Sequence, residues 1–259
     1  NQEIMDEVGI ESIDTKEDFM KYMEAVSKDG RFGYGGSWEK TYASNEIAQF
    51  VNMFGGDYFD WTKEENKEAI QFLHDLVANK ETPVDQIADK YDQMNPKIND
   101  GKYGCWFMWG LGTDYAKADM LGADKIHMAM VPDFSGNGER AIFTDSWNYV
   151  LNSASKNKDA AITFLQYMAD EGGMEASYKA FDRYPARKDV AEKVVPDTDP
   201  AKEMYSQYAE ECNVQGRPLV AQTMEFISDM GTIFQSCMKD EITVDEFCKK
   251  AQEVVDTYQ

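Results

Sequence analysis

The chain contains 259 residues, which suits one large α/β domain or two lobes better than one small β-sandwich. Hydrophobic residues make up 42% of the sequence, so a buried core is expected and wholesale disorder is excluded. The 48 acidic residues outnumber the 26 basic ones, and the formal net charge of −22 argues against binding to nucleic acid or to an anionic membrane surface.

Helices dominate the predicted elements. Apolar residues recur at helical spacing in nine segments: 15–28, 44–54, 62–77, 84–98, 160–168, 173–181, 201–212, 224–237 and 243–254. Three of these helices are predicted to begin with a capping box. In this motif two residues three positions apart each use the side chain to bond the backbone N–H of the other. The pairs are Thr15 with Asp18, Thr62 with Glu65, and Thr243 with Glu246.

Four strands are expected between the helices: 31–36, 103–109, 126–131 and 141–151. Strands that alternate with helices predict an α/β fold, with helices on both faces of a sheet. The sequence contains no internal repeat, low-complexity tract or flexible linker. Any lobe boundary must therefore be a short hinge inside continuous structure.

No catalytic, metal or cofactor site is predicted. The two histidines, His74 and His127, lie in no triad or metal-ligand pattern, and neither a G-x-S-x-G elbow nor a P-loop is present. Residues 133–138 begin like a calcium loop, but Thr144 stands at position 12 where a bidentate Glu is needed, so a polar turn is expected. The four cysteines lack C-x-x-C spacing and are expected to be free thiols, with a bridge between positions 237 and 248 left open.

Aromatic residues make up 13% of the chain. Rings stack on the C–H faces of sugars, and carboxylates accept hydrogen bonds from sugar hydroxyls, so an acidic, aromatic-rich surface suits neutral polar ligands. Most of the rings are nevertheless expected in the core. No run of 18 apolar residues occurs, so no membrane-spanning segment is predicted.

The order of several short motifs resembles one family. These motifs occupy residues 101–110, 130–132, 145–151, 155–165, 185–190 and 243–252. In that order they resemble the extracellular solute-binding proteins of ABC importers, family 1, the carbohydrate type that includes maltodextrin-binding protein. Two departures stand out, since Asp145 and Ser146 replace a usual glycine pair, and Glu225 stands where many members carry a ligand-stacking tryptophan.

The resemblance implies a helix-rich, two-lobe fold of the class II periplasmic-binding-protein type, truncated at its N-terminus. Residues 5–18 look like the family stretch just after the first lobe crossing, so about a hundred residues of the N-terminal lobe are expected to be missing. The expected division is 1–131 for the first part of the C-terminal lobe, 132–195 for the returning segment of the N-terminal lobe, and 196–259 for the last C-terminal-lobe helices.

The resemblance also implies a clamp that closes on a sugar without chemistry. Seven residues are the candidate ligand contacts: Trp38, Tyr42, Trp109, Trp147, Tyr184, Arg187 and Glu225. Trp109 is preferred over Trp106 because ligands of open α/β sheets bind at the carboxyl ends of strands. A purely structural role stays open for Trp147, as core, and for Arg187, as the partner of an acid.

The implied partners are a small carbohydrate and the permease subunits of an ABC transporter, with no nucleic acid and no membrane insertion of this segment. We expect a bacterial, monomeric protein outside the cytoplasm, either a cell-surface lipoprotein or a periplasmic protein. The alternatives are a glycoside-hydrolase-like enzyme with paired carboxylates, a helical interaction module, and a binding protein for a polyamine or a peptide.

Overall fold

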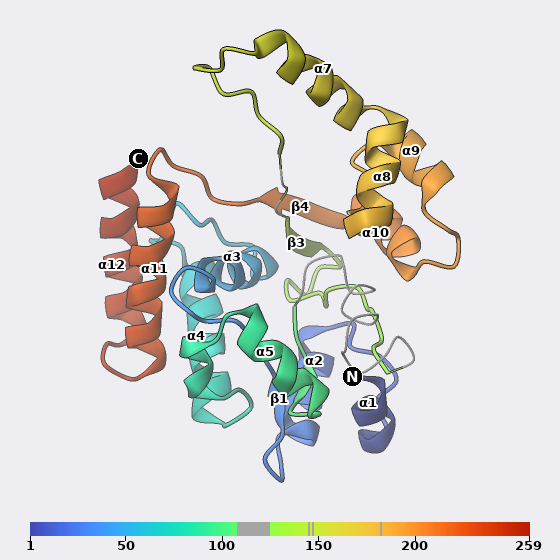
Figure 1. The fold of residues 1–259 in the computed structure, drawn as a ribbon. Helices are drawn as coiled ribbons and strands as arrows, with labels where there is room; N and C mark the ends of the chain where they lie inside the picture. The colour runs from blue at the N-terminus through green and yellow to red at the C-terminus, as the bar shows by residue number, and fades with distance from the viewer. Residues whose placement is uncertain (108–124, 145, 147, 182) are drawn as a thin grey trace.

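A helical body makes up most of the molecule. The computed structural model describes residues 1–107, 125–144, 146, 148–181 and 183–259. The body consists of α1 (Gln2–Val8), α2 (Lys16–Val26), α3 (Ala43–Met53), α4 (Glu64–Ala78), the 3₁₀ turn η1 (Val84–Ala88), α5 (Tyr91–Asn99), α11 (Thr223–Met238) and α12 (Val244–Tyr258). Helix α3 lies in the middle of this body, and α11 and α12 form an antiparallel pair along one side (Figure 1).

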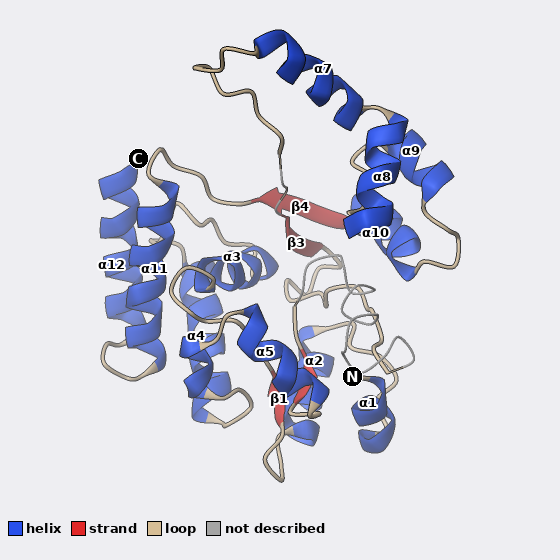
Figure 2. Ribbon diagram, viewed as in Figure 1, coloured by secondary structure: helices blue, strands red, loops and turns tan. Residues whose placement is uncertain are grey.

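Two short parallel pairs of strands are the β-structure of the described residues (Figure 2). In the first, β1 (Phe32–Tyr34) pairs with β2 (Tyr103–Cys105) inside the helical body. In the second, β3 (Arg140–Thr144) pairs with β4 (Cys212–Gly216), from Arg140 opposite Cys212 to Thr144 opposite Gly216. Parallel strands need long crossover connections, and the crossover between β3 and β4 is a group of helices.

This second group of helices stands apart from the helical body in Figure 1. It contains α7 (Lys158–Ala169), α8 (Glu171–Phe181), α9 (Lys188–Val194) and α10 (Pro200–Glu211). Tyr184, just before α9, packs on Tyr205 of α10 with ring centroids 4.3 Å apart. Lys202 of α10 also donates to the carbonyl of Val195 at 3.1 Å. Helix α10 therefore packs with its predecessors rather than with α11 and α12.

The core of the helical body is aromatic and centres on α3, every residue of which is buried. The Phe50 ring lies 5.7 Å from Tyr34 of β1, 5.8 Å from Phe72 of α4 and 5.5 Å from Phe107. Burying each side chain of this size stabilises the fold by about 1.5–3 kcal/mol. The central helix thus ties β1, the segment after β2 and α4 into one packed unit.

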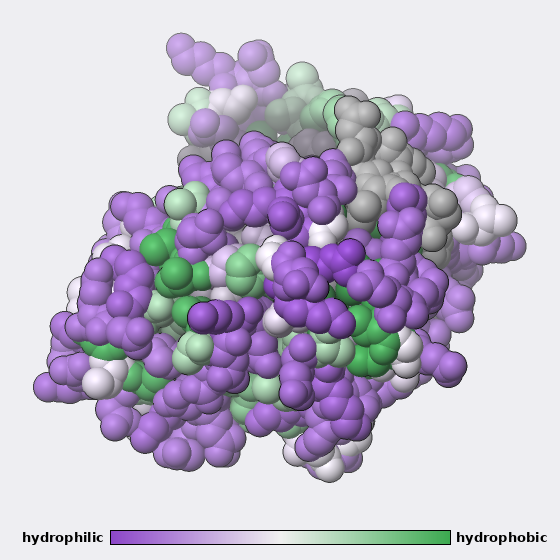
Figure 3. Space-filling model, turned by 90° about the horizontal axis from the view of Figure 1, so that it is seen from below, coloured by the Kyte–Doolittle hydropathy of each residue, from purple (hydrophilic) through white to green (hydrophobic). Residues whose placement is uncertain are grey.

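The surface of the body is mostly hydrophilic, as the view from below shows (Figure 3). Only scattered hydrophobic patches interrupt the polar face, in keeping with the net charge of −22. No helix within the described ranges is both long and apolar enough to cross a lipid bilayer.

Two of the three predicted capping boxes are confirmed. The Thr15 hydroxyl accepts from the Asp18 N–H at 3.1 Å, and the Thr243 hydroxyl accepts from the Glu246 N–H at 3.2 Å. The third is wrong, because α4 begins one residue too late for Thr62 to cap it. The Thr62 hydroxyl instead donates to Asp60.

Several predicted segments differ from the structure. Residues 126–131 form no strand, and the predicted strands at 103–109 and 141–151 are shorter than expected where they are described. The single helix expected at 84–98 is broken into η1 and α5, because the backbone between them receives a hydrogen bond from Glu39. The four cysteines are free, as expected, including Cys237 and Cys248 on the neighbouring helices α11 and α12.

Candidate functional site

The loop between β1 and α3 was the first predicted site segment, and it splits into a buried and an accessible part. Trp38 is 0% exposed, and its Nε1–H donates to the carboxylate of Glu46 at 2.6 Å. Its ring packs edge-on against Phe234 of α11, with centroids 5.1 Å apart. The prediction of Trp38 as a ligand contact is therefore corrected, because an indole enclosed in the core is unavailable to stack on a sugar.

Tyr42 lies four residues further on, directly before α3, and is only partly buried. Its ring meets that of Tyr91, the first residue of α5, with centroids 5.2 Å apart at 81°. The Nζ of Lys90 lies 5.9 Å from the Tyr42 ring centroid, within the range of a cation–π contact. Two partly exposed rings and an amine thus gather where the starts of α3 and α5 meet.

Helix α3 is also joined to the strands that lead to the second group of helices. Gln49 donates to the carbonyl of Ala141 at 3.0 Å and accepts from the N–H of Phe143 at 2.7 Å, so one side chain bonds β3 like a strand neighbour. Asn45, one turn earlier, accepts from Arg217 just after β4 at 3.1 Å. The central helix is therefore bonded to the backbone of β3 and to the segment that follows β4.

Tyr184 and Arg187 lie together in the second group of helices. Tyr184 is half-buried against Tyr205. The Arg187 guanidinium forms a bidentate pair with Asp189, through Nε at 3.1 Å and Nη2 at 2.7 Å, and it also donates to the carbonyl of Ala169. This pairing raises the pKa of Arg187 and lowers that of Asp189. Arg187 thus fastens the start of α9 to the end of α7.

The remaining predicted contacts lie in different parts of the chain. Glu225 is exposed in the first turn of α11, where a carboxylate suits the positive end of the helix dipole. Trp109 and Trp147 lie outside the described residues. Trp106, which was ranked below Trp109, is partly buried against Met94 and Tyr103.

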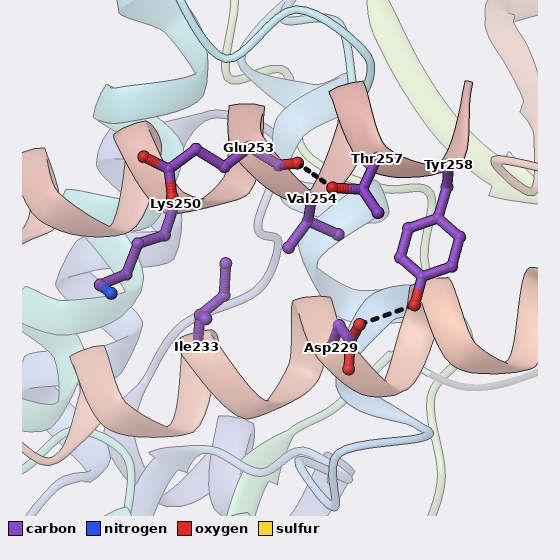
Figure 4. A pocket seen from close by; sticks show the side chains of 7 residues that line it. All are labelled: Asp229, Ile233, Lys250, Glu253, Val254, Thr257 and Tyr258. Atoms are coloured by element: carbon purple, nitrogen blue, oxygen red, sulfur yellow. Dashed lines mark hydrogen bonds between the residues drawn. The ribbon is translucent and has the colours of Figure 1, made fainter.

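Two surface grooves occur beside α11 and α12, and neither is lined by a predicted site residue. The first, of about 230 Å³, lies between α11 and α12, where Tyr258 donates to Asp229 at 2.7 Å (Figure 4). The second, of about 320 Å³, includes His74, whose Nε2 lies 2.8 Å from Asp240. Among the described residues, no group of three or more His, Cys, Asp or Glu side chains could hold a metal ion.

Some residues of the candidate region were missed in the sequence. Glu46 and Gln49 are two of the buried polar residues of α3, and they join this helix to the loop and to β3. Their signal in the sequence is a polar side chain within a predicted helix, which Ser44, Asn45 and Asn52 share. Arg217 and Tyr91 carry no such signal, because their partners lie far away along the chain.

The fold is that of the two-lobe solute-binding proteins. Maltose-bound MalE3 of Thermotoga maritima matches with a TM-score of 0.83 at 17% identity, over 99% of this chain and 68% of that chain. A solute-binding protein of Thermotoga lettingae bound with α-D-tagatose matches at 0.82 and 19% identity, with the same coverage. One of Agrobacterium vitis with bound D-mannitol matches at 0.73 and 17% identity, again over 99% and 68%.

The chain belongs to the bacterial extracellular solute-binding protein family, whose model matches residues 1–175. The search of curated proteins found no match. The family match confirms the resemblance of the motifs, and the structural matches confirm the helix-rich two-lobe fold that the resemblance implied. The family is one of binding proteins rather than of enzymes.

Proposed function

We propose that this protein captures a sugar or oligosaccharide outside the cytoplasm and delivers it, unchanged, to the permease of an ABC transporter. The family match over residues 1–175 carries the proposal. Three solved proteins of the same fold, bound with maltose, tagatose and mannitol, support a carbohydrate as the ligand class. We further propose that the protein acts as a monomer and without catalysis, as a lipoprotein or in the periplasm.

Tyr42 is the described residue that we propose as a ligand contact on the helical body. Its ring is partly exposed and stands beside Tyr91 and Lys90 at the starts of two helices. A tyrosine offers a flat apolar face and a hydroxyl, which together match the C–H face and hydroxyls of a sugar. Trp109, Trp147, Tyr184 and Glu225 stay proposed contacts.

Arg187 stays within the proposal only as a residue that shapes its neighbourhood. Both of its Asp189 bonds and its bond to the Ala169 carbonyl fix the guanidinium between α9 and α7. A ligand hydroxyl would compete with a bidentate carboxylate, which is a stronger partner for a guanidinium.

The strands β3 and β4 are proposed as the hinge between the lobes. They connect the helical body with the helices α7 to α10, and Gln49 bonds β3 to the central helix. Because α10 packs with Tyr184 and Val195, we propose that the second lobe boundary lies at β4 rather than near residue 195. Short strand hinges allow closure with small backbone changes.

Calorimetric titration with maltose, tagatose and a chito-oligosaccharide tests the proposal. At least one sugar is expected to bind, and Tyr42→Ala and Trp147→Ala are each expected to weaken it by roughly 1–3 kcal/mol. Tyr167→Ala is the matched control, because Tyr167 is a 52% exposed tyrosine on α7 that is not among the proposed contacts. Its affinity is expected to equal that of the wild type.

Other outcomes would redirect the assignment. Binding of spermidine but of no sugar would replace the carbohydrate by a polyamine, which many acidic side chains attract. Turnover of a chromogenic glycoside would contradict a binding protein without catalysis. Equal sugar affinity in Tyr42→Ala, Trp147→Ala and Tyr167→Ala would reject these two contacts while leaving the function standing.

A further inference from the structure

The first part of the loop that precedes Tyr42, residues 34–39, is completely hydrogen-bonded on its N–H side. Between residues 34 and 39 every N–H donates to a protein acceptor: Tyr34 to Glu81 O, Gly35 to Cys105 O, Gly36 to Gln86 Oε1, Ser37 to Glu46 Oε1, Trp38 to Gln86 O, and Glu39 to Asp89 O. A surface loop usually leaves several such groups to water. This loop is instead built like a fixed part of the core.

Glu46 of α3 holds the centre of the loop. One oxygen of its carboxylate accepts from the Tyr34 hydroxyl at 2.7 Å and from the Trp38 Nε1–H at 2.6 Å. The other oxygen accepts from the Ser37 N–H at 2.9 Å. The residue is 6% exposed, and none of the ion pairs between described residues includes it. A buried carboxyl group without a cation is costly, so its three donors are the local compensation.

The loop backbone at Gly36 lies so close to the Glu46 carboxylate that no side chain fits between them. A Cβ on Gly36 would lie 2.5 Å from one carboxylate oxygen and 2.6 Å from the other. On its other side the loop is held by Gln235 of α11, whose amide donates to the Trp38 carbonyl at 2.8 Å. The loop is therefore clamped between α3 and α11, with Glu46 as the clamp on the α3 side.

We propose that Glu46 is the positioning residue of the ligand-binding surface on the helical body. Its two oxygens fix Ser37 and Trp38, and this fixes the path of the chain into Tyr42 four residues later. The loop is then preformed before any ligand arrives, so little ordering entropy opposes binding on this side. The inference deepens the proposed function and rests on it for the part that concerns sugar affinity.

The chemistry of Glu46 predicts the effect of an isosteric change. In Glu46→Gln an NH₂ group replaces one oxygen, and an amide nitrogen cannot accept a hydrogen bond. In one orientation this NH₂ faces the Trp38 Nε1–H, and in the other it faces the Ser37 N–H. Neither partner can accept, so one buried N–H loses its acceptor in either case.

Amide hydrogen exchange of the loop tests the inference without any ligand. In Glu46→Gln, exchange at residues 34–39 is expected to accelerate at least tenfold, while exchange in α12 stays unchanged. The matched control is Glu68→Gln, which removes an exposed carboxylate from α4 and should leave the loop as in the wild type. Unchanged loop exchange in Glu46→Gln, or an equal rise throughout the chain, would overturn the proposal.

A milder variant covers the case in which Glu46→Gln does not fold. Trp38→Phe keeps an aromatic ring in the core and removes the Nε1–H together with part of the indole, so the loop amides are expected to exchange about threefold faster. If that variant exchanges like the wild type, the Glu46–Trp38 bond does not fix the loop, and the proposal fails.

Maltose affinity then separates positioning from general stability. In folded protein, Glu46→Gln alone is expected to weaken maltose binding about tenfold. Added to Tyr42→Ala, it is expected to weaken binding much less, because both changes remove the same contact. Full additivity of the two losses would show that Glu46 does not act through Tyr42. If the wild type binds no sugar, the proposed function fails, whereas the exchange result still decides whether Glu46 fixes the loop.

Discussion

Gly231 in the middle of α11 allows this helix to touch the site loop directly. A Cβ at this position would lie 1.9 Å from the carbonyl oxygen of Lys40, 2.6 Å from its carbonyl carbon and 2.7 Å from its Cα. All three atoms belong to the backbone, so no side chain can rotate away. In Gly231→Ala the helix and the loop must therefore separate by roughly 1.5 Å to reach ordinary contact distances.

The expected loss of stability follows from two opposing terms. Overpacking of this kind costs about 1–3 kcal/mol, and the upper end applies because Gln235 and Asp89 bond the loop at Trp38 and Glu39, directly before Lys40. Replacing a helical glycine by alanine returns at most about 1 kcal/mol of helix propensity. The net loss is about 2 kcal/mol, which for a chain of this size lowers Tm by roughly 4–8 °C.

Thermal unfolding followed by circular dichroism measures this loss, with Gly172→Ala in α8 as the matched control. The nearest atom to a Cβ at Gly172 is a Tyr167 ring carbon at 3.7 Å, which is an ordinary contact. Gly172→Ala should therefore be neutral or slightly stabilising. If Gly231→Ala is as stable as Gly172→Ala, the close approach of α11 to the loop is refuted.

Two further predictions concern a helix cap and a buried acid. Thr243→Ala removes the capping box of α12 and should lower the free energy of unfolding, measured in urea, by about 1 kcal/mol. Thr62→Ala is the control, because the Thr62 hydroxyl bonds Asp60 and caps no helix, and it should change this free energy by less than about 0.5 kcal/mol. Equal losses in the two variants would contradict the capping assignment. Burial raises the pKa of Glu46 above its ordinary 4.5, so the folded state binds its proton more tightly and the free energy of unfolding falls as pH rises from 4.5 toward the folded pKa. The Tm of the wild type minus that of Glu46→Gln should thus shrink over this pH window, and a difference that is constant with pH would contradict it.

The helices of the body were predictable because their signals are local. The capping boxes at Thr15 and Thr243 involve groups three residues apart, and their apolar stripes repeat with the helical period. At Thr62 the same spacing failed, because α4 begins at Glu64 and Lys63 rather than Thr62 stands at its N-cap. A local motif is thus reliable only where the helix begins at the residue that could cap it.

The strands were harder to predict, because a strand exists only with its partner. β4 is polar and largely exposed, and it is held by its ladder with β3, seventy-two residues earlier in the sequence. Nothing in residues 212–216 alone distinguishes them from the end of α10. Residues 126–131 show the opposite error, since an alternating apolar pattern without a partner strand among the described residues forms no strand.

The site loop shows why the family was easier to predict than its contacts. Trp38 and Tyr42 stand in one glycine-rich segment, and both rings suit a sugar equally well. Their fates differ because the Trp38 indole N–H donates to Glu46 inside the core, whereas the Tyr42 ring meets Tyr91 in a partly exposed position. The order of motifs along the chain identifies a fold, but the choice between a core ring and a ligand contact depends on which polar groups the fold brings opposite each ring.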